Sequence, residues 1–369
     1  MSETETGKAE GPTADDYALV AKAAAEVEAP DLPYRPPTPR DRKQPIALVG
    51  AGGISAAHLD AYARHGLNVV AICSRDLKRA TARRDAYFPS AHVTDDFDFL
   101  LSDPTLSVLD LTAHPDVRLD LMRRALNAGK HVLSQKPFVE NIDDGLKLVE
   151  LAARRGLKLA VNQNGRWAPH LSYIREAVHA GLIGEVTAVH LEIRWNHAWI
   201  AGTPFERIDD VILWDFGIHW FDFLASVIGE RARSVYATAA RAAGQAARPP
   251  LLAQALIAFD GGQASLVFDG ATRYGARDST SVIGAKGVAS STGPDLGHQA
   301  VELYMEAGVA RPRLAGQWFN DGFAGAMGEL LCAIEDRREP LNSARGNLVS
   351  LKLCQAALRS VETGAPELV

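Results

Sequence analysis

Apolar residues follow two patterns along the chain, and the pattern changes near residue 165. In the first half, short continuous apolar runs alternate with segments of helical spacing. The runs predict buried strands at 46–50, 68–73, 107–113, 131–135 and 158–163, and the segments between them predict helices at 54–66, 77–88, 118–129 and 144–156. Strands that alternate with helices of this length indicate an α/β domain with a doubly wound parallel sheet.

Beyond residue 165, apolar and polar positions alternate over longer segments. They predict strands at 185–196, 232–240, 251–260, 262–270 and 279–291, and closing helices at 322–338 and 344–363. Such alternation is typical of an antiparallel sheet that is covered by helices on one face. We therefore expect a second domain of α+β type over 165–369, with a large, open, mostly antiparallel sheet. Its uncovered face predicts a homodimer or homotetramer formed through this C-terminal sheet.

Residues 1–44 differ from both domains. Residues 14–29 have the composition of a short helix, and the proline-rich stretch at 30–45 predicts extended chain. Two interpretations of this N-terminal extension stay open, a free tail or an arm that lies over a neighbouring subunit.

Composition narrows the class of protein. A net charge of −6 over 369 residues argues against a general nucleic-acid or anionic-membrane surface. No uninterrupted apolar run reaches the ~20 residues of a membrane span. The polar, acidic N-terminus does not look like a secretory signal, and three scattered cysteines fit a reducing compartment. We expect a cytoplasmic protein whose partner is a small molecule, without nucleic acid or membrane.

A glycine-rich turn lies directly after the first predicted strand and before a helix. Gly50, Gly52 and Gly53 permit a tight turn and a close backbone approach to a pyrophosphate, with Ile54 opening the helix whose N-terminus would hold it. The third position of this fingerprint is Ser55 rather than glycine. The flanking strand and helix favour a dinucleotide site over a purely structural turn. We therefore expect an NAD(P)-binding Rossmann domain over 45–164.

The end of the second strand bears on which dinucleotide binds. An NAD site usually has an acidic residue there, which binds the ribose 2′-hydroxyl. This strand instead runs into Ser74 and Arg75, with Lys78 close behind. Serine and arginine can bind a 2′-phosphate, although basic residues also begin solvated helices. We expect a preference for NADP, with NAD possible.

Four motifs occur in a defined order: "GAGGISAAH", "AGKHVLSQKP", "VNQNGRWAPHLSYIREAVHAGLIGEV" and "WDFGIHWFD". From about residue 46 to the C-terminus they resemble the glucose–fructose oxidoreductase/inositol dehydrogenase (Gfo/Idh/MocA) family. The resemblance implies that Lys136, Asp215 and His219 form the catalytic group. The residues that we expect to bind the cofactor are Gly50, Gly52, Gly53, Ile54, Ser74, Arg75, Lys78, Thr112, His114, Gln135, Lys136, Asn164 and Arg166.

The spacing within the last motif suits proton transfer. A helix would place Asp215 and His219, four residues apart, on one face. An imidazole with a pKa near ~6.5 can accept the proton of a hydroxyl group at neutral pH. Asp215 would orient the ring, and Lys136 would bind the reacting oxygen. Without the other motifs, a salt-bridged helix face would be the preferred interpretation.

Aromatic residues gather around the same motif, since five of the six tryptophans fall within 167–220. Aromatic faces suit the C–H faces of sugar rings, although tryptophans more commonly fill cores. We expect a sugar or polyol to be bound by Trp167, His197, Trp199, Asp215 and His219. We expect no metal site, because ligand spacing occurs only at Asp215, His219 and Asp222, which already have an interpretation.

Two positions depart from the family pattern. Gln135 replaces the usual glutamate before the lysine, and Arg118 stands where a histidine is frequent. The leading interpretation remains an NAD(P)-dependent oxidoreductase that acts on a secondary hydroxyl or ketone of a sugar, glycoside or polyol. One alternative is a redox-neutral enzyme that uses bound NAD for transient sugar oxidation, in glycoside cleavage, elimination or epimerisation. The other is a dinucleotide-sensing protein without catalysis.

Overall fold

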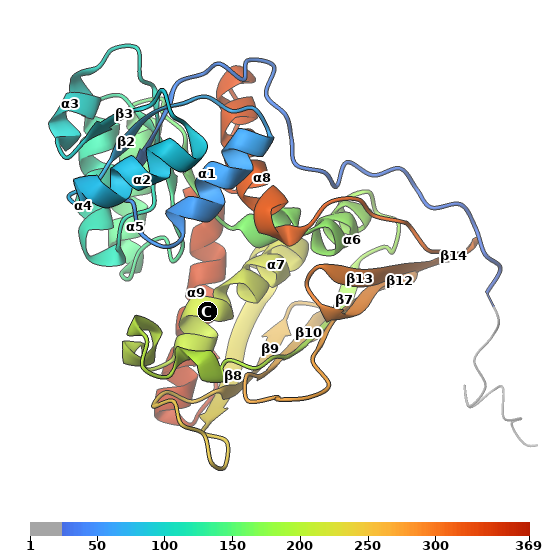
Figure 1. Ribbon diagram of the computed structural model, residues 1–369. Helices are drawn as coiled ribbons and strands as arrows, with labels where there is room; N and C mark the ends of the chain where they lie inside the picture. The colour runs from blue at the N-terminus through green and yellow to red at the C-terminus, as the bar shows by residue number, and fades with distance from the viewer. Residues whose placement is uncertain (1–23) are drawn as a thin grey trace, which may run out of the picture.

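The computed structural model describes residues 24–369 and contains two sheets (Figure 1). The first sheet has six parallel strands in the order β3-β2-β1-β4-β5-β6. Its strands are β1 (Ile46–Val49), β2 (Val69–Cys73), β3 (His92–Thr94), β4 (Val108–Leu111), β5 (His131–Ser134) and β6 (Leu159–Val161). The connecting helices are α1 (Ser55–Arg64), α2 (Leu77–Tyr87), α3 (Phe97–Ser102), α4 (Pro115–Asn127) and α5 (Ile142–Arg154). This order is that of a Rossmann fold, which confirms the predicted doubly wound sheet.

The second sheet has nine strands in the order β14-β13-β12-β11-β7-β10-β9-β8-β15. The strands are β7 (Val186–Arg194), β8 (Ala232–Ala240), β9 (Leu252–Phe259), β10 (Gly262–Asp269), β11 (Arg277–Gly284), β12 (Gly287–Asp295), β13 (His298–Met305), β14 (Gly308–Ala310) and β15 (Glu367–Leu368). The pair β7–β10 is parallel and the other neighbours are antiparallel, so the predicted mostly antiparallel sheet is confirmed. The predicted single strand at 279–291 is wrong, because Ala285 and Lys286 reverse the chain between β11 and β12.

Four long helices complete the molecule: α6 (Pro169–His179), α7 (Ile218–Ile228), α8 (Trp318–Glu335) and α9 (Ala344–Thr363). Short helical turns occur at η1 (Asn164–Trp167), η2 (Ala198–Ile200), η3 (Pro204–Arg207), η4 (Ile212–Phe216, π-helical) and η5 (Gly229–Arg231). Helix α8 packs against α1, and its Phe323, Met327 and Leu330 share one apolar core with Ile46 and Leu48 of β1. A helix from the end of the chain therefore stabilises the Rossmann sheet.

Residues 24–44, which we call the strap, run in extended form over the outside of their own chain, from the edge of the nine-stranded sheet to the Rossmann domain (Figure 1). At the sheet edge, the Val27 amide donates to the Val309 carbonyl at 2.9 Å. At the other end, the Asp41 amide donates to the carboxylate of Glu335 in α8 at 2.8 Å. Residues 24–44 are thus bound to their own chain rather than free, and an arm that lies over a neighbouring subunit stays a prediction. The possible helix at 14–29 falls mostly outside the described residues, and 24–29 are extended.

Candidate active site

The glycine turn has the geometry that a dinucleotide needs. Gly50 has φ +110° and sits so close to the next loop that an added Cβ would lie 2.7 Å from the Ala113 nitrogen. Gly52 and Gly53 have nothing within 4 Å of an added Cβ, so their backbone is open to a ligand. The Thr112 hydroxyl donates to the Gly50 carbonyl at 2.6 Å and fixes the turn from β4. These residues fit a pyrophosphate at the N-terminus of α1.

The end of β2 lies next to this turn. Ser74 is half-buried, Arg75 and Lys78 are exposed, and none of the three has an acidic partner among residues 24–369. Asp76, the nearest acid, caps α2 by accepting from the Arg79 amide at 3.0 Å. His114, expected near the cofactor, is exposed beside Asp116.

Lys136 directly follows β5 and Gln135, at the carboxyl end of the parallel sheet. Its Nζ donates to the Asp215 carboxylate at 2.9 Å and to the Asp215 carbonyl at 2.7 Å. Both side chains are about five-sixths buried, each with 16% of its surface exposed. A lysine ammonium carries three N–H donors, so the third is left for another oxygen.

The spacing predicted that Asp215 and His219 share one regular helix. They do not. Asp215 lies in the π-helical turn η4, and His219 lies in the first turn of α7. In this turn both the carbonyl and the carboxylate of Asp215 accept from Lys136. Turns of this kind are often found at functional sites.

His219 is surrounded by aromatic rings. The Trp318 ring lies edge-on at 5.5 Å and the Trp220 ring at 6.4 Å. Burial, together with the nearby charge of Lys136, holds the pKa of His219 well below its usual value. Its Nδ1 is buried and has no hydrogen-bond partner among the described residues. The imidazole is therefore neutral at neutral pH and able to accept a proton.

A buried polar network supports Lys136 from behind. The Gln135 side-chain oxygen accepts from the Lys136 amide at 2.8 Å and from Asn162 at 3.1 Å. Asn162 also bonds Nε2 of His58 at 3.1 Å, and His58 Nδ1 lies 2.8 Å from Asp110. Gln135 thus holds the lysine backbone in this structure. Local sequence patterns do not reveal the pair of His58 and Asp110, because their contact forms only when helix α1 packs against strand β4.

Arg118 has a similar structural role. It is 2% exposed and donates to the Ala113 and Pro137 carbonyls, so it joins the loop after β4 to the loop after β5 that holds Lys136. Burial lowers its pKa to about 10, so it stays charged.

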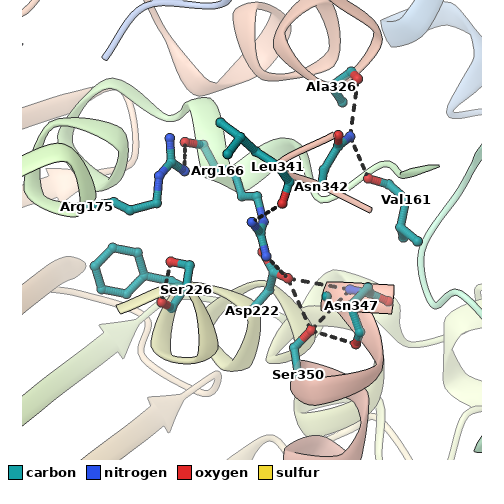
Figure 2. Close-up of polar contacts among 12 residues, drawn as sticks. Val161, Arg166, Arg175, Asp222, Ser226, Ala326, Leu341, Asn342, Asn347 and Ser350 are labelled. Atoms are coloured by element: carbon teal, nitrogen blue, oxygen red, sulfur yellow. Dashed lines mark hydrogen bonds and ion pairs between the residues drawn. The ribbon is translucent and has the colours of Figure 1, made fainter. Parts of the chain in front are cut away.

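Arg166 and Asp222 form a bidentate ion pair (Figure 2). Arg166 Nε donates to Asp222 at 2.6 Å, and Nη2 donates to the other carboxylate oxygen at 2.9 Å. Nη1 donates to the Leu341 carbonyl at 2.6 Å, so all three guanidinium nitrogens are used within the chain. Asn164, also expected near the cofactor, accepts from the Trp318 indole at 3.0 Å. These contacts join the Rossmann sheet to α7 and α8 and leave little of either side chain for a ligand.

The residues of the predicted aromatic pocket differ in their surroundings, since Trp167 is buried and Trp199 is exposed. Trp167 is 2% exposed and packs so tightly on α8 that only glycine fits at Gly325, so it belongs to the core. Trp199 is 52% exposed, and its ring lies 6.5 Å from the buried ring of His197. Nδ1 of His197 has no hydrogen-bond partner in residues 24–369, and burial lowers the pKa of His197 to about 4. It lines a small cavity together with Ile193, Trp195, Ile212, Phe216, Trp220, Phe268 and Gly270.

Trp318 was not predicted as a site residue, although its ring packs against His219 with the ring centres 5.5 Å apart. It lies about a hundred residues beyond the motif that contains His219. No local pattern links the two. Among residues 24–369, no group of three His, Cys, Asp or Glu side chains is placed to hold a metal, and no helix is long and apolar enough to cross a membrane.

Comparison with known protein families shows which family this chain belongs to. Residues 45–163 match the model of an oxidoreductase family with an NAD-binding Rossmann fold, and residues 171–290 match the GFO/IDH/MocA C-terminal domain. The chain belongs to the Gfo/Idh/MocA family. It is an NAD-binding oxidoreductase of that family, as the resemblance in the four motifs had implied.

Individual relatives agree with this assignment. Inositol 2-dehydrogenase from Rhizobium meliloti (strain 1021) is 27% identical over 324 residues, which cover 86% of this chain and 96% of that protein. An oxidoreductase from Agrobacterium radiobacter, solved with NAD+, L-tartaric acid and magnesium, aligns with a TM-score of 0.78 at 21% identity over 88% of this chain and 98% of its own. The WlbA dehydrogenase from Bordetella pertussis, solved with NADH and UDP-GlcNAcA, aligns with a TM-score of 0.72 at 22% identity over 89% of this chain and 99% of its own.

Proposed function

We propose that the protein is a dehydrogenase or ketoreductase that acts on a secondary hydroxyl or ketone of a sugar, glycoside or polyol, with NADP preferred over NAD. The observation that carries this proposal is the Lys136 ammonium, held by Asp215 beside a neutral, unpaired His219. The activity named for the inositol 2-dehydrogenase of Rhizobium meliloti supports the substrate class.

The residues divide the proton chemistry between them. The open glycine turn would hold the dinucleotide, whose nicotinamide accepts or supplies the hydride when bound. Lys136 directs its remaining N–H at the substrate oxygen and stabilises negative charge there. His219 takes the hydroxyl proton in oxidation and returns it in reduction, and its low pKa keeps it in the accepting form at neutral pH. Asp215 fixes the direction of the lysine.

Substitution of the two proton-handling residues tests this assignment. We expect Lys136→Ala and His219→Ala each to lower turnover of a screened polyol or sugar by roughly 10²- to 10⁴-fold while dinucleotide affinity stays within a few-fold. Lys147→Ala and His298→Ala change exposed residues of the same types and serve as controls. Near wild-type turnover in either active-site variant would contradict its role.

The cofactor preference rests on Ser74, Arg75 and Lys78 and on the absence of an acid at the end of β2. Titration of the purified protein with NADPH and NADH, followed by nicotinamide fluorescence, tests it. Tighter binding of NADPH is expected. Dinucleotide that co-purifies as NAD(H) and does not exchange would contradict the preference and favour the redox-neutral alternative.

We also propose a homodimer or homotetramer formed through the outer face of the nine-stranded sheet. On adjacent strands β8 and β9, Tyr236 and Leu256 pair with one another and point away from the helices, with 39% and 55% of their surfaces exposed. Burying such a face removes apolar surface from water. Light scattering after size-exclusion chromatography measures the assembly, and a monomer would contradict it.

A further inference from the structure

Arg83 of α2 is bound to the glycine turn. Its Nε donates to the Ser55 hydroxyl at 3.1 Å, and its Nη2 donates to the Gly52 carbonyl at 3.3 Å. The Ser55 hydroxyl in turn donates to the Gly52 carbonyl at 2.6 Å. Ser55 is fully buried and Arg83 half-buried, so the guanidinium is held in place rather than left in solvent.

This arrangement depends on the position where the chain departs from the glycine fingerprint. A third glycine at residue 55 would have no hydroxyl, and Arg83 Nε would lose its partner. Within residues 24–369, Nη1 of Arg83 makes no hydrogen bond and the guanidinium has no acidic partner, whereas the neighbouring Arg84 is paired with Asp85. A half-buried guanidinium without a counter-ion is costly unless an anion completes it.

An open cavity of about 270 Å³ lies beside Arg83. It is lined by Ala51, Gly52, Gly53, Arg79, Ala82 and Arg83. One wall is the turn that would bind the pyrophosphate, and the other is the helix that follows β2. In this fold the adenosine ribose presents its 2′ position toward the end of the second strand, on the same side as α2. A group attached at that position lies near this cavity.

We propose that Arg83, held by Ser55 and assisted by Arg79, binds the 2′-phosphate of NADP and is a determinant of cofactor choice. The inference rests on the proposed NADP preference and extends it to residues beyond the end of β2. The 2′-phosphate supplies the anion that Arg83 lacks, whereas the 2′-hydroxyl of NAD does not.

Binding measurements test this assignment without any substrate. NADPH, NADH and 2′,5′-ADP are titrated into the wild type, Arg83→Gln and Ser55→Gly, with Arg84→Gln as the matched control on the same helix. We expect Arg83→Gln to lower the affinity for NADPH and 2′,5′-ADP by roughly 10- to 100-fold and the affinity for NADH by less than about twofold. Ser55→Gly should weaken NADPH binding several-fold, because the variant keeps the charge of Arg83 but removes the hydroxyl that holds its guanidinium.

The outcomes separate two kinds of failure. Wild-type protein that prefers NADH would overturn the NADP preference before any variant is made. A wild type that prefers NADPH, together with equal losses of NADPH and NADH in Arg83→Gln, would assign Arg83 to the pyrophosphate and overturn this inference alone. Unchanged binding would leave Arg83 as a structural brace and overturn it as well. If Arg83→Gln does not fold, Arg83→Lys keeps the charge without the planar fork, and an equal change in NADPH and NADH affinity in that variant would contradict the assignment.

Discussion

His219 and Asp222 lie one turn apart on α7, and their surroundings differ in one respect. Asp222 is 1% exposed and accepts hydrogen bonds from Nε and Nη2 of Arg166 and from Ser350 at 3.1 Å (Figure 2). His219 is enclosed by indole rings and its Nδ1 has no partner among the described residues. A buried group whose atoms are all paired fixes structure, whereas a desolvated imidazole with an unpaired ring nitrogen is available for chemistry. One helix therefore carries both a structural tie and a reactive group.

The largest effect should come from breaking the structural tie. Asp222→Ala leaves the Arg166 guanidinium buried without its counter-ion, and we expect a loss of roughly 3–5 kcal/mol in the free energy of unfolding. Urea denaturation of the wild type and the variant measures it. Asp209→Ala, which removes a carboxylate that is 76% exposed, should cost less than about 1 kcal/mol. A stable Asp222→Ala protein without turnover would instead place Asp222 in the reaction.

The same contrast shows what the sequence could reveal. Strand and helix periodicity predicted the Rossmann sheet, and short motifs predicted Lys136, Asp215 and His219 as site residues. Each of these signals is contained in a short stretch of consecutive residues. The pairing of Arg166 depends on Asp222, Leu341 and Ser350, which are far from it in the chain. Periodicity cannot reveal such contacts, so the sequence does not predict the ion pair of Arg166 with Asp222. Trp318 escaped notice for the same reason, since it reaches His219 only after α8 folds back.

Asp278 extends the comparison between paired and unpaired buried groups. It is a buried carboxylate that lacks the partners that Asp222 has among the described residues. It lies on β11 with no exposed surface, and neither oxygen has a hydrogen-bond partner among the described residues. Burial raises its pKa from 3.8 to about 7. Between these pH values the folded protein holds a proton that the unfolded chain has released, so this group lowers stability as the pH rises from about 4 to about 7.

Asp278→Asn removes that titration. We expect the free energy of unfolding of the variant to exceed that of the wild type by about 1.5 kcal/mol at pH 5 and by up to ~4 kcal/mol above pH 7. Denaturation at pH 5 and pH 8 measures both values, with the exposed Asp209→Asn as a control. A variant less stable than the wild type at pH 8 would show that the carboxylate has a partner after all, as Asp222 does.

The smallest effect concerns the strap, which touches the reaction pocket only through other residues. The Tyr34 hydroxyl accepts from the Ala315 amide at 2.9 Å, three residues before Trp318, and its ring packs edge-on against Tyr173 at 5.9 Å. Tyr34→Phe keeps the ring and leaves one amide unpaired, so we expect a loss of ~1 kcal/mol in unfolding free energy. Tyr274→Phe, at a side chain that is 91% exposed, should change nothing measurable. If the strap only stabilises the fold, turnover of folded Tyr34→Phe stays at the wild-type value. If turnover or KM changes as well, the strap also holds Trp318 against His219, and the reactive group on α7 depends on a segment that lies outside both matched family domains.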